Sequence, residues 1–129
     1  MKPEKEHVNM TLTMDRYIAA TDRAIADKSL LGELLAVFAP EAVVQIADVP
    51  FRGTEAIREF YAQFVADHAE SKHFWTTTVL PDGRQRTEWV CAARKTDGSL
   101  ITIAGIEHAQ LDSQGRIADL HNEFTRPPA

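Results

Sequence analysis

A single glutamate on an otherwise apolar face of a strand is the residue of this sequence best placed for chemistry. Residues 100–111 alternate in the manner of a β-strand, and every second residue of a strand faces the same side. The side that carries Glu107 otherwise carries Ile101, Ile103, Gly105, Ala109 and Leu111. Burying an unpaired carboxyl is costly. Glu107 is therefore either an acid of a small-molecule pocket, where burial would raise its pKa, or the partner of Arg94 or Lys95 across a hairpin.

Two tyrosines and one aspartate could complete such a site. Tyr17 and Tyr61 lie on the apolar faces of expected helices, where each would either fill the core or offer its hydroxyl to a pocket. Asp48 comes two residues after Ile46 and would share its face if the strand continued. It could act there as a general base, or it could form a turn beside Pro50.

Two histidines and an asparagine on the expected strands are further candidates. Histidine is the usual acid–base group near neutral pH, and His73 would either face the pocket or lie on an outer or dimer face. Asn122 shares a strand face with Leu120 and Phe124. We therefore expect Asn122 to be the polar group of the pocket on the last strand, with His121 pointing away.

Other kinds of chemistry have less support in the sequence. The five histidines lack the paired H-x-x-x-H spacing of a zinc site, and no serine stands in a nucleophile-elbow context. Cys91 alternates within an expected strand, as a core residue would. We therefore expect no metal and no cofactor.

Composition restricts the partners and the compartment. The 129 residues suffice for one domain with a real core, and their net charge is −5 with no cluster of basic residues. We expect neither a nucleic acid nor a membrane as a partner. The single cysteine and the lack of a signal-peptide pattern indicate the cytoplasm. Residues 11–125 are expected to form the domain, between a flexible tail over 1–10 and a polar end over 126–129.

The expected elements run from helices to strands. Helical spacing of apolar residues predicts helices over 13–25, 30–38 and 54–67, the third capped by Thr54. Alternation and turn residues predict strands over 42–47, 73–80, 86–94, 100–111 and 116–124, with a turn at 51–53. Helices followed by hairpin-linked strands indicate an α+β fold. Its helices would pack on one face of a curved sheet and leave a concavity for a ligand.

Four segments carry a resemblance to a known family. Residues 38–44, 51–61, 106–108 and 111–117 resemble the nuclear transport factor 2-like superfamily, particularly its SnoaL-like and ketosteroid-isomerase-like branch. The resemblance extends from Thr13 to Phe124. It implies a cone-shaped α+β barrel, in which three N-terminal helices pack on a curved, mostly antiparallel sheet around an interior pocket. It also implies a homodimer packed through the sheet.

The resemblance assigns roles to individual residues. Glu107 falls at the place of the acid in the oxyanion hole of ketosteroid isomerases, an acid kept neutral by its apolar surroundings. Tyr17 resembles the tyrosine of that oxyanion hole, and Tyr61 resembles the tyrosine that supports it. The place of the general-base aspartate falls on Ile46, which cannot take a proton, so Asp48 is the candidate base on this strand.

The sequence thus predicts a cofactor-free acid–base enzyme of the isomerase, cyclase or dehydratase type, acting on a small hydrophobic molecule. Its expected catalytic residues are Glu107, Tyr17 and Asp48. The expected pocket residues are Tyr61, Phe60, Ile46, Phe38, Ile103, Leu120, Asn122 and Phe124. Because Ile46 stands at the family's base position, the alternative is a non-catalytic ligand-binding or dimeric accessory domain of the same fold.

Overall fold

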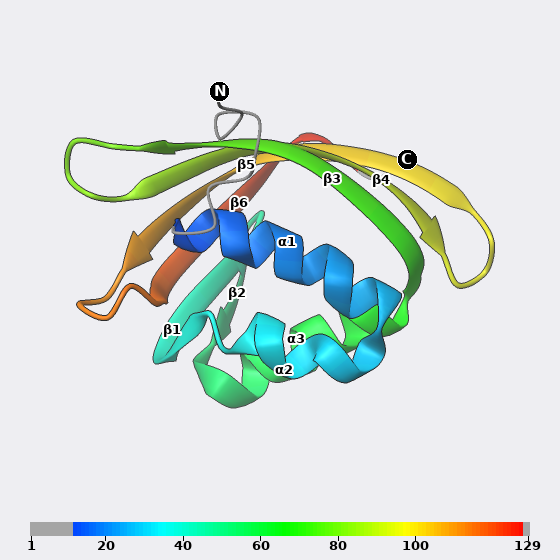
Figure 1. The fold of residues 1–129 in the computed structure, drawn as a ribbon, viewed down its shortest axis with the longest axis horizontal. Helices are drawn as coiled ribbons and strands as arrows, with labels where there is room; N and C mark the ends of the chain where they lie inside the picture. Colours follow the sequence, from blue (N-terminus) through cyan, green and yellow to red (C-terminus); the bar gives the residue numbers. More distant parts are fainter. Residues whose placement is uncertain (1–11, 128–129) are drawn as a thin grey trace, which may run out of the picture.

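A computed structural model describes residues 12–127 as a curved, unclosed sheet that arches over three helices (Figure 1). The strands are β1 (Phe38–Ile46), β2 (Val49–Arg52), β3 (His68–Val79), β4 (Gln85–Lys95), β5 (Leu100–Leu111) and β6 (Ile117–Arg126). They lie in the order β2-β1-β6-β5-β4-β3. Only the β1–β6 pair is parallel, and the other neighbours are antiparallel. The predicted α+β cone is confirmed. The tail predicted over residues 1–10 lies outside the described residues.

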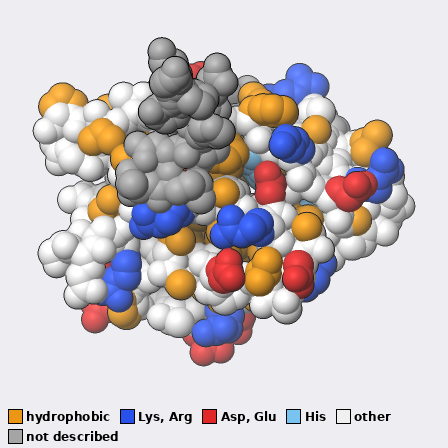
Figure 2. Space-filling view, in the orientation of Figure 1, with side chains coloured by type: hydrophobic (Ala, Val, Ile, Leu, Met, Phe, Trp, Pro, Cys, Tyr) orange, Lys and Arg blue, Asp and Glu red, His pale blue; other side chains and the backbone are white. Residues whose placement is uncertain are grey.

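The helices all lie on the concave side of the sheet (Figure 1). They are α1 (Thr13–Ala26), the short α2 (Leu31–Leu35) and α3 (Gly53–Ala66). The buried side chains of α1 and α3 form one hydrophobic core with the inner residues of β1, β5 and β6. No described helix is long and apolar enough to cross a membrane. Charges of both signs are interspersed on the face drawn in Figure 2.

The helix predicted over 30–38 is wrong in its second half. A 3-10 turn (Lys28–Leu30) precedes α2, which ends at Leu35. The carbonyl of Val37 accepts a hydrogen bond from the amide of Ile117, and Phe38 pairs with Ile117 in the parallel ladder. These long-range bonds to β6 outweigh the local helical preference, so the chain is already extended at Phe38.

The turn predicted at 51–53 is also wrong. Residues Val49–Arg52 form β2, which pairs with β1 so that Ile46 lies opposite Val49. The chain reverses its direction earlier, at Ala47 and Asp48. The φ of Ala47 is 55°, in the left-handed region. Because the strand ends at Ile46, Asp48 does not continue its face; it lies in the turn before Pro50, which was the alternative that the sequence offered.

Thr54 does not cap α3 as predicted. The N-cap residue is Arg52, which makes no side-chain cap, and the Thr54 hydroxyl donates instead to the carbonyl oxygen of Pro40 at 3.0 Å. This bond ties the start of α3 to β1. The strand predicted to begin at residue 73 already begins at His68, directly after α3.

Candidate functional site

Glu107 lies inside the cone, at the centre of a row of inward-facing side chains. In the register of the sheet its neighbours are Thr87 on β4 and Asn122 on β6. Only 4% of Glu107 is exposed. The alternation of β5 therefore places its one carboxyl on the buried side, as predicted. The alternative ion pair is wrong, because Arg94 pairs with Glu70 at 2.9 Å and, within residues 12–127, Lys95 makes no ion pair with Glu107.

Two helical tyrosines reach the Glu107 carboxyl as a hydrogen-bonded chain. The Tyr17 hydroxyl, from α1, donates to Oε2 of Glu107 at 3.4 Å, and the hydroxyls of Tyr17 and Tyr61 are 2.8 Å apart. A hydroxyl has one proton to donate. Since Tyr17 gives its proton to Glu107, Tyr61, from α3, donates to Tyr17. The structure thus brings together three of the predicted site residues.

Burial raises the pKa values of all three groups in this hydrogen-bonded row. It raises the pKa of Glu107 to about 7, although the charge of His73 and the hydrogen bond from Tyr17 both favour the carboxylate. Burial, together with the Glu107 charge, also raises the pKa of Tyr17 and of Tyr61. The carboxyl can therefore gain or lose a proton near neutral pH, whereas the tyrosines stay protonated.

His73 faces the same interior and is held by an aspartate of α1. Its Nδ1 lies 2.7 Å from Oδ1 of Asp22, and its backbone N–H donates to Oδ2 of Asp22 at 2.9 Å. The Ser71 hydroxyl donates to the same carboxyl. Burial lowers the pKa of His73, but Asp22 and the nearby Cys91 thiol outweigh it and raise the pKa to about 9. The raised pKa makes His73 a cation at neutral pH. Because its side chain is buried and lines the interior, a position on an outer or dimer face is excluded.

A cavity of about 80 Å³ lies between these groups. The residues that line it are Tyr17, Ile18, Thr21, Ile46, Phe60, Phe64, His68, Ser71, His73, Trp89, Cys91, Ala93, Ile103, Glu107, Asn122 and Phe124. This volume is well below the roughly 300 Å³ of a pocket for a drug-sized ligand. A molecule that enters without rearrangement of the walls must be small.

Five of the eight expected pocket residues line this cavity, namely Ile46, Phe60, Ile103, Asn122 and Phe124. The other three lie behind its wall. Leu120 is fully buried, and the ring of Phe38 packs against those of Tyr17 and Tyr61 at centroid distances of 5.9 and 5.5 Å. Tyr61 reaches the site through its bond to Tyr17. His121 points to the outer face, where it lies opposite His108.

Asp48 is not brought to this cavity. It lies exposed in the turn between β1 and β2, and it is not among the lining residues. The early end of β1 is the reason, since the left-handed Ala47 turns the chain outward one residue before Asp48. The role of Asp48 as a base stays a prediction.

Sequence reasoning missed the group that orients His73. Asp22 follows Asp15 by seven residues, so both lie on one side of α1, and that spacing was the available signal. Asp15, which is buried, accepts hydrogen bonds from the indole of Trp75 and the hydroxyl of Thr77. Both aspartates anchor α1 to β3.

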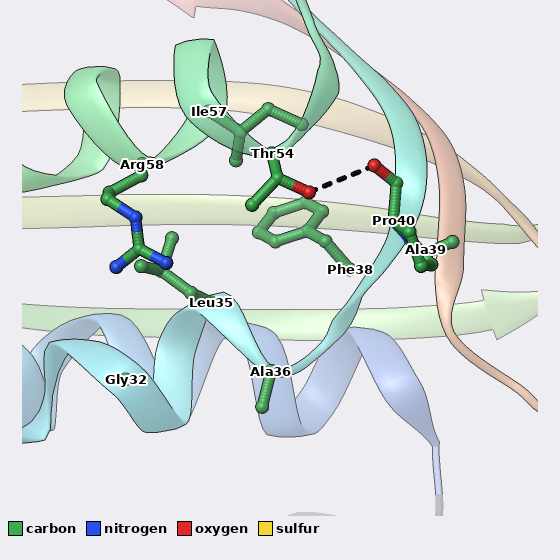
Figure 3. Close-up of a pocket in the computed structure, with 9 residues that line it drawn as sticks. All are labelled: Gly32, Leu35, Ala36, Phe38, Ala39, Pro40, Thr54, Ile57 and Arg58. Carbon is green, nitrogen blue, oxygen red and sulfur yellow. Dashed lines mark hydrogen bonds between the residues drawn. The ribbon is translucent and has the colours of Figure 1, made fainter.

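A larger hollow of about 320 Å³ lies outside the cone, between α2, α3 and β1 (Figure 3). Phe38 and Ile57 form part of its apolar wall, and the Arg58 side chain extends along its edge (Figure 3). Arg58, its one charged lining residue, is exposed. The central cavity, with its buried acid and base, is therefore the candidate site. Within residues 12–127, no three His, Cys, Asp or Glu side chains could together hold a metal ion.

Comparisons with known proteins agree with this fold. Residues 14–120 match the SnoaL-like domain family. An NTF2-like protein of unknown function from Exiguobacterium sp. 255-15 is 24% identical, with a TM-score of 0.78 over 87% of this chain and 97% of that one. A Mycobacterium tuberculosis protein in complex with estradiol-17beta-hemisuccinate is 13% identical, with a TM-score of 0.70 over 84% and 91% of the two chains. A computationally designed 17-OHP binder is 14% identical, with a TM-score of 0.71 over 84% and 90%. No curated protein matches the sequence.

Proposed function

The chain belongs to the SnoaL-like family of the NTF2-like superfamily, and on this premise we propose that it is a cofactor-free acid–base enzyme for a small hydrophobic substrate. The observation that carries the proposal is the pair Glu107 and His73, two buried titratable groups that line one cavity. With a pKa of about 7 for Glu107 and about 9 for His73, about half of the molecules in a neutral solution have a carboxylate and an imidazolium lining the same cavity. That combination is a base and an acid ready for use at the same pH.

The proposed reaction moves one proton out of the substrate and another in. The Glu107 carboxylate removes a proton from a substrate carbon, and the His73 imidazolium delivers one to a second carbon or to a departing hydroxyl. The first case is an isomerisation, and the second is a dehydration that releases water. Protonated Glu107 and neutral His73 then return to their starting states by exchange with solvent. Asp22 holds the His73 ring in place through Nδ1.

Tyr17 has a positioning role in this scheme. Its hydrogen bond holds one oxygen of Glu107 and favours the ionised form of that group. Phe60, Ile103 and Phe124 supply apolar walls that suit a hydrophobic substrate. This assignment makes Glu107 the base in place of Asp48, which the sequence had suggested.

The isomerisation of cyclohex-3-enone tests the proposal, because the conjugated product absorbs in the ultraviolet and the step needs only a base and an acid. Glu107→Gln should lower the rate by about a hundredfold to ten-thousandfold, the usual contribution of a general base. Glu88→Gln, an exposed residue of β4, is the matched control. Loss of the activity in Asp48→Asn while Glu107→Gln keeps it would transfer the role of base to Asp48.

A binding module without turnover is the second candidate. Two similar structures, the mycobacterial complex and the designed binder, are described by the steroids that they bind. Saturable binding of cyclohex-3-enone with no isomerisation above the rate of buffer would favour this function and contradict the first.

We also propose the homodimer through the sheet that the sequence predicted. Phe74 and Val90 are opposite one another on the outer face of β3 and β4, and they are 64% and 49% exposed. Burying such a pair against a second copy would remove apolar surface from water. A monomeric mass by light scattering would contradict it. The cytoplasmic location stays a prediction.

A further inference from the structure

We infer that the side-chain amide of Asn122 is held with its N–H₂ group toward the cavity, where it selects small molecules that carry a hydrogen-bond acceptor oxygen. The inference rests on the proposed function in one respect only, namely that the ligand occupies the same cavity. It adds the chemistry of recognition and a pair of positioning residues, Trp89 and Gly105.

The indole of Trp89 determines which way this amide points. Its Nε1 lies 3.0 Å from Oδ1 of Asn122. An indole N–H can only donate, so the atom that it meets must be the amide oxygen and not the nitrogen. With Oδ1 occupied, Nδ2 is the atom of Asn122 that remains for a ligand.

Gly105 allows this contact to form. Trp89 is on β4 and Asn122 is on β6, and β5 runs between these two strands. A Cβ at position 105 would lie 2.8 Å from Cζ2 of Trp89 and 2.7 Å from the carbonyl oxygen of Glu123. The indole therefore lies against the backbone of β5 at Gly105, the one inward-facing residue of this strand without a side chain. Any larger residue would push the indole away from Asn122.

The Nδ2 group is placed to donate a hydrogen bond to a bound ligand. Asn122 is 4% exposed and lines the cavity, and Nδ2 has no hydrogen-bond partner among residues 12–127. A buried donor without a partner is costly, and a bound acceptor oxygen would supply the missing bond. The sequence contains no signal for this orientation, since it depends on a contact between β4 and β6.

The neighbouring side chains define the rest of the ligand. Asn122 lies directly opposite Glu107 in the register, so the amide donor and the carboxyl are side by side. Ile103, Ile46 and Phe124 are apolar parts of the same wall. The best fit is a small, mostly apolar carbonyl compound. Its oxygen would accept from Asn122, and the adjacent carbon would face Glu107.

Binding of cyclohexanone, compared with methylenecyclohexane, tests this inference by ¹H–¹⁵N NMR. The two probes have nearly the same shape, and only the ketone offers an acceptor oxygen. We expect the ketone, and not the alkene, to shift the side-chain amide signals of Asn122. Asn122→Leu should remove the preference for the ketone, because leucine has a similar volume and no donor.

Trp89→Phe tests the positioning role separately. It removes the indole N–H, so the amide can rotate, and ketone affinity should fall by about tenfold, the effect of one well-placed hydrogen bond. Trp75→Phe is the matched control, because the indole of Trp75 donates to Asp15 instead. The NMR spectrum of each variant reports whether it is folded.

The outcomes separate recognition from catalysis. Equal responses to both probes, or no ketone-specific shift of the Asn122 amide at the solubility limit, would overturn the inference even if cyclohex-3-enone is isomerised. A ketone-specific shift without isomerisation would support recognition by Asn122 and contradict the acid–base proposal. Affinity that falls equally in Trp89→Phe and Trp75→Phe would overturn the positioning role of Trp89.

Discussion

Two carboxyl groups of this protein differ in the direction of their pKa shifts. Glu107 on β5 is fully buried and has a raised pKa, whereas Asp22 on α1 is partly buried and has a lowered pKa. Glu107 receives a hydrogen bond from a neutral hydroxyl, and burial raises its pKa to about 7. Burial acts on Asp22 in the same sense, but the hydrogen bonds and charge of His73 and the Ser71 hydroxyl outweigh it and lower its pKa. Burial alone therefore does not decide the charge of a carboxyl; its partner does.

Glu107 and His73 both contribute less stability as the pH rises, whereas Asp22 contributes less as the pH falls. Folded Glu107 holds its proton up to a pKa of about 7, whereas an unfolded glutamate releases it near 4.5, so folding becomes less favourable between these values. His73 has a folded pKa of about 9 against 6.5 for the model group. Its stabilisation is complete below pH 6.5 and is lost as the pH rises through 9. The Asp22 side has the reverse dependence, because its lowered pKa contributes stability that disappears when the solution is acidified.

The largest expected effect follows removal of the Asp22 carboxyl. Asp22→Ala leaves the His73 cation buried without its counter-charge, which should cost about 3–4 kcal/mol in the free energy of unfolding at pH 6. Urea denaturation measures it. The loss should shrink above pH 9, where His73 is neutral. Asp82→Ala breaks an exposed pair with Arg84 and should have a far smaller effect. Equal losses in both variants would show that the Asp22 pair is no stronger than a surface pair.

Glu107→Gln should change stability in the opposite direction. At pH 8 the buried carboxylate destabilises the folded protein. Each unit of raised pKa corresponds to about 1.4 kcal/mol, so the neutral amide should stabilise the protein by on the order of 3 kcal/mol. At pH 4 both side chains are neutral and the difference should vanish. Urea denaturation at the two pH values checks this. A gain that is the same at pH 4 and pH 8 would mean that Glu107 does not carry a raised pKa.

Tyr17→Phe tests how the neutral Tyr17 hydroxyl affects the pKa of Glu107. The lost hydrogen bond favoured the carboxylate, so the pKa of Glu107 should rise above 7, and the protein should lose about 1 kcal/mol of stability. A ¹³C NMR titration of the glutamate carboxyls measures the first quantity. Tyr61→Phe is the matched variant, because it leaves the Tyr17–Glu107 bond in place and should move the Glu107 pKa less.

The smallest effect is expected for a carboxyl that has neither burial nor a partner. Asp48 is exposed and makes no ion pair or side-chain hydrogen bond within residues 12–127. Asp48→Asn should change the free energy of unfolding by less than about 0.5 kcal/mol at any pH. Urea denaturation at pH 4 and pH 8 measures this, and a pH-dependent change would place Asp48 in a network that the fold does not reveal.

The sequence by itself determined the side of the sheet on which the main candidates lie. Strand alternation places Glu107 and Asn122 inward and His121 outward, because successive side chains of a strand point to opposite faces and one face must be apolar. The family resemblance in turn indicated that Tyr17 and Tyr61 lie near that carboxyl, and the structure joins the three through hydroxyl contacts. These predictions succeeded because they depend on local periodicity and on a shared fold.

Only the tertiary structure decided which groups lie together. The left-handed Ala47 moves Asp48 away from the site, the parallel pairing with β6 makes Phe38 part of a strand, and Asp22 meets His73 across α1 and β3. The reach of Trp89 over Gly105 to Asn122 joins three strands. Each of these contacts links residues far apart in the chain, so no local pattern contains it. Burial by the assembled cone, rather than the identity of the residue, gives Glu107 a proton affinity suited to neutral pH.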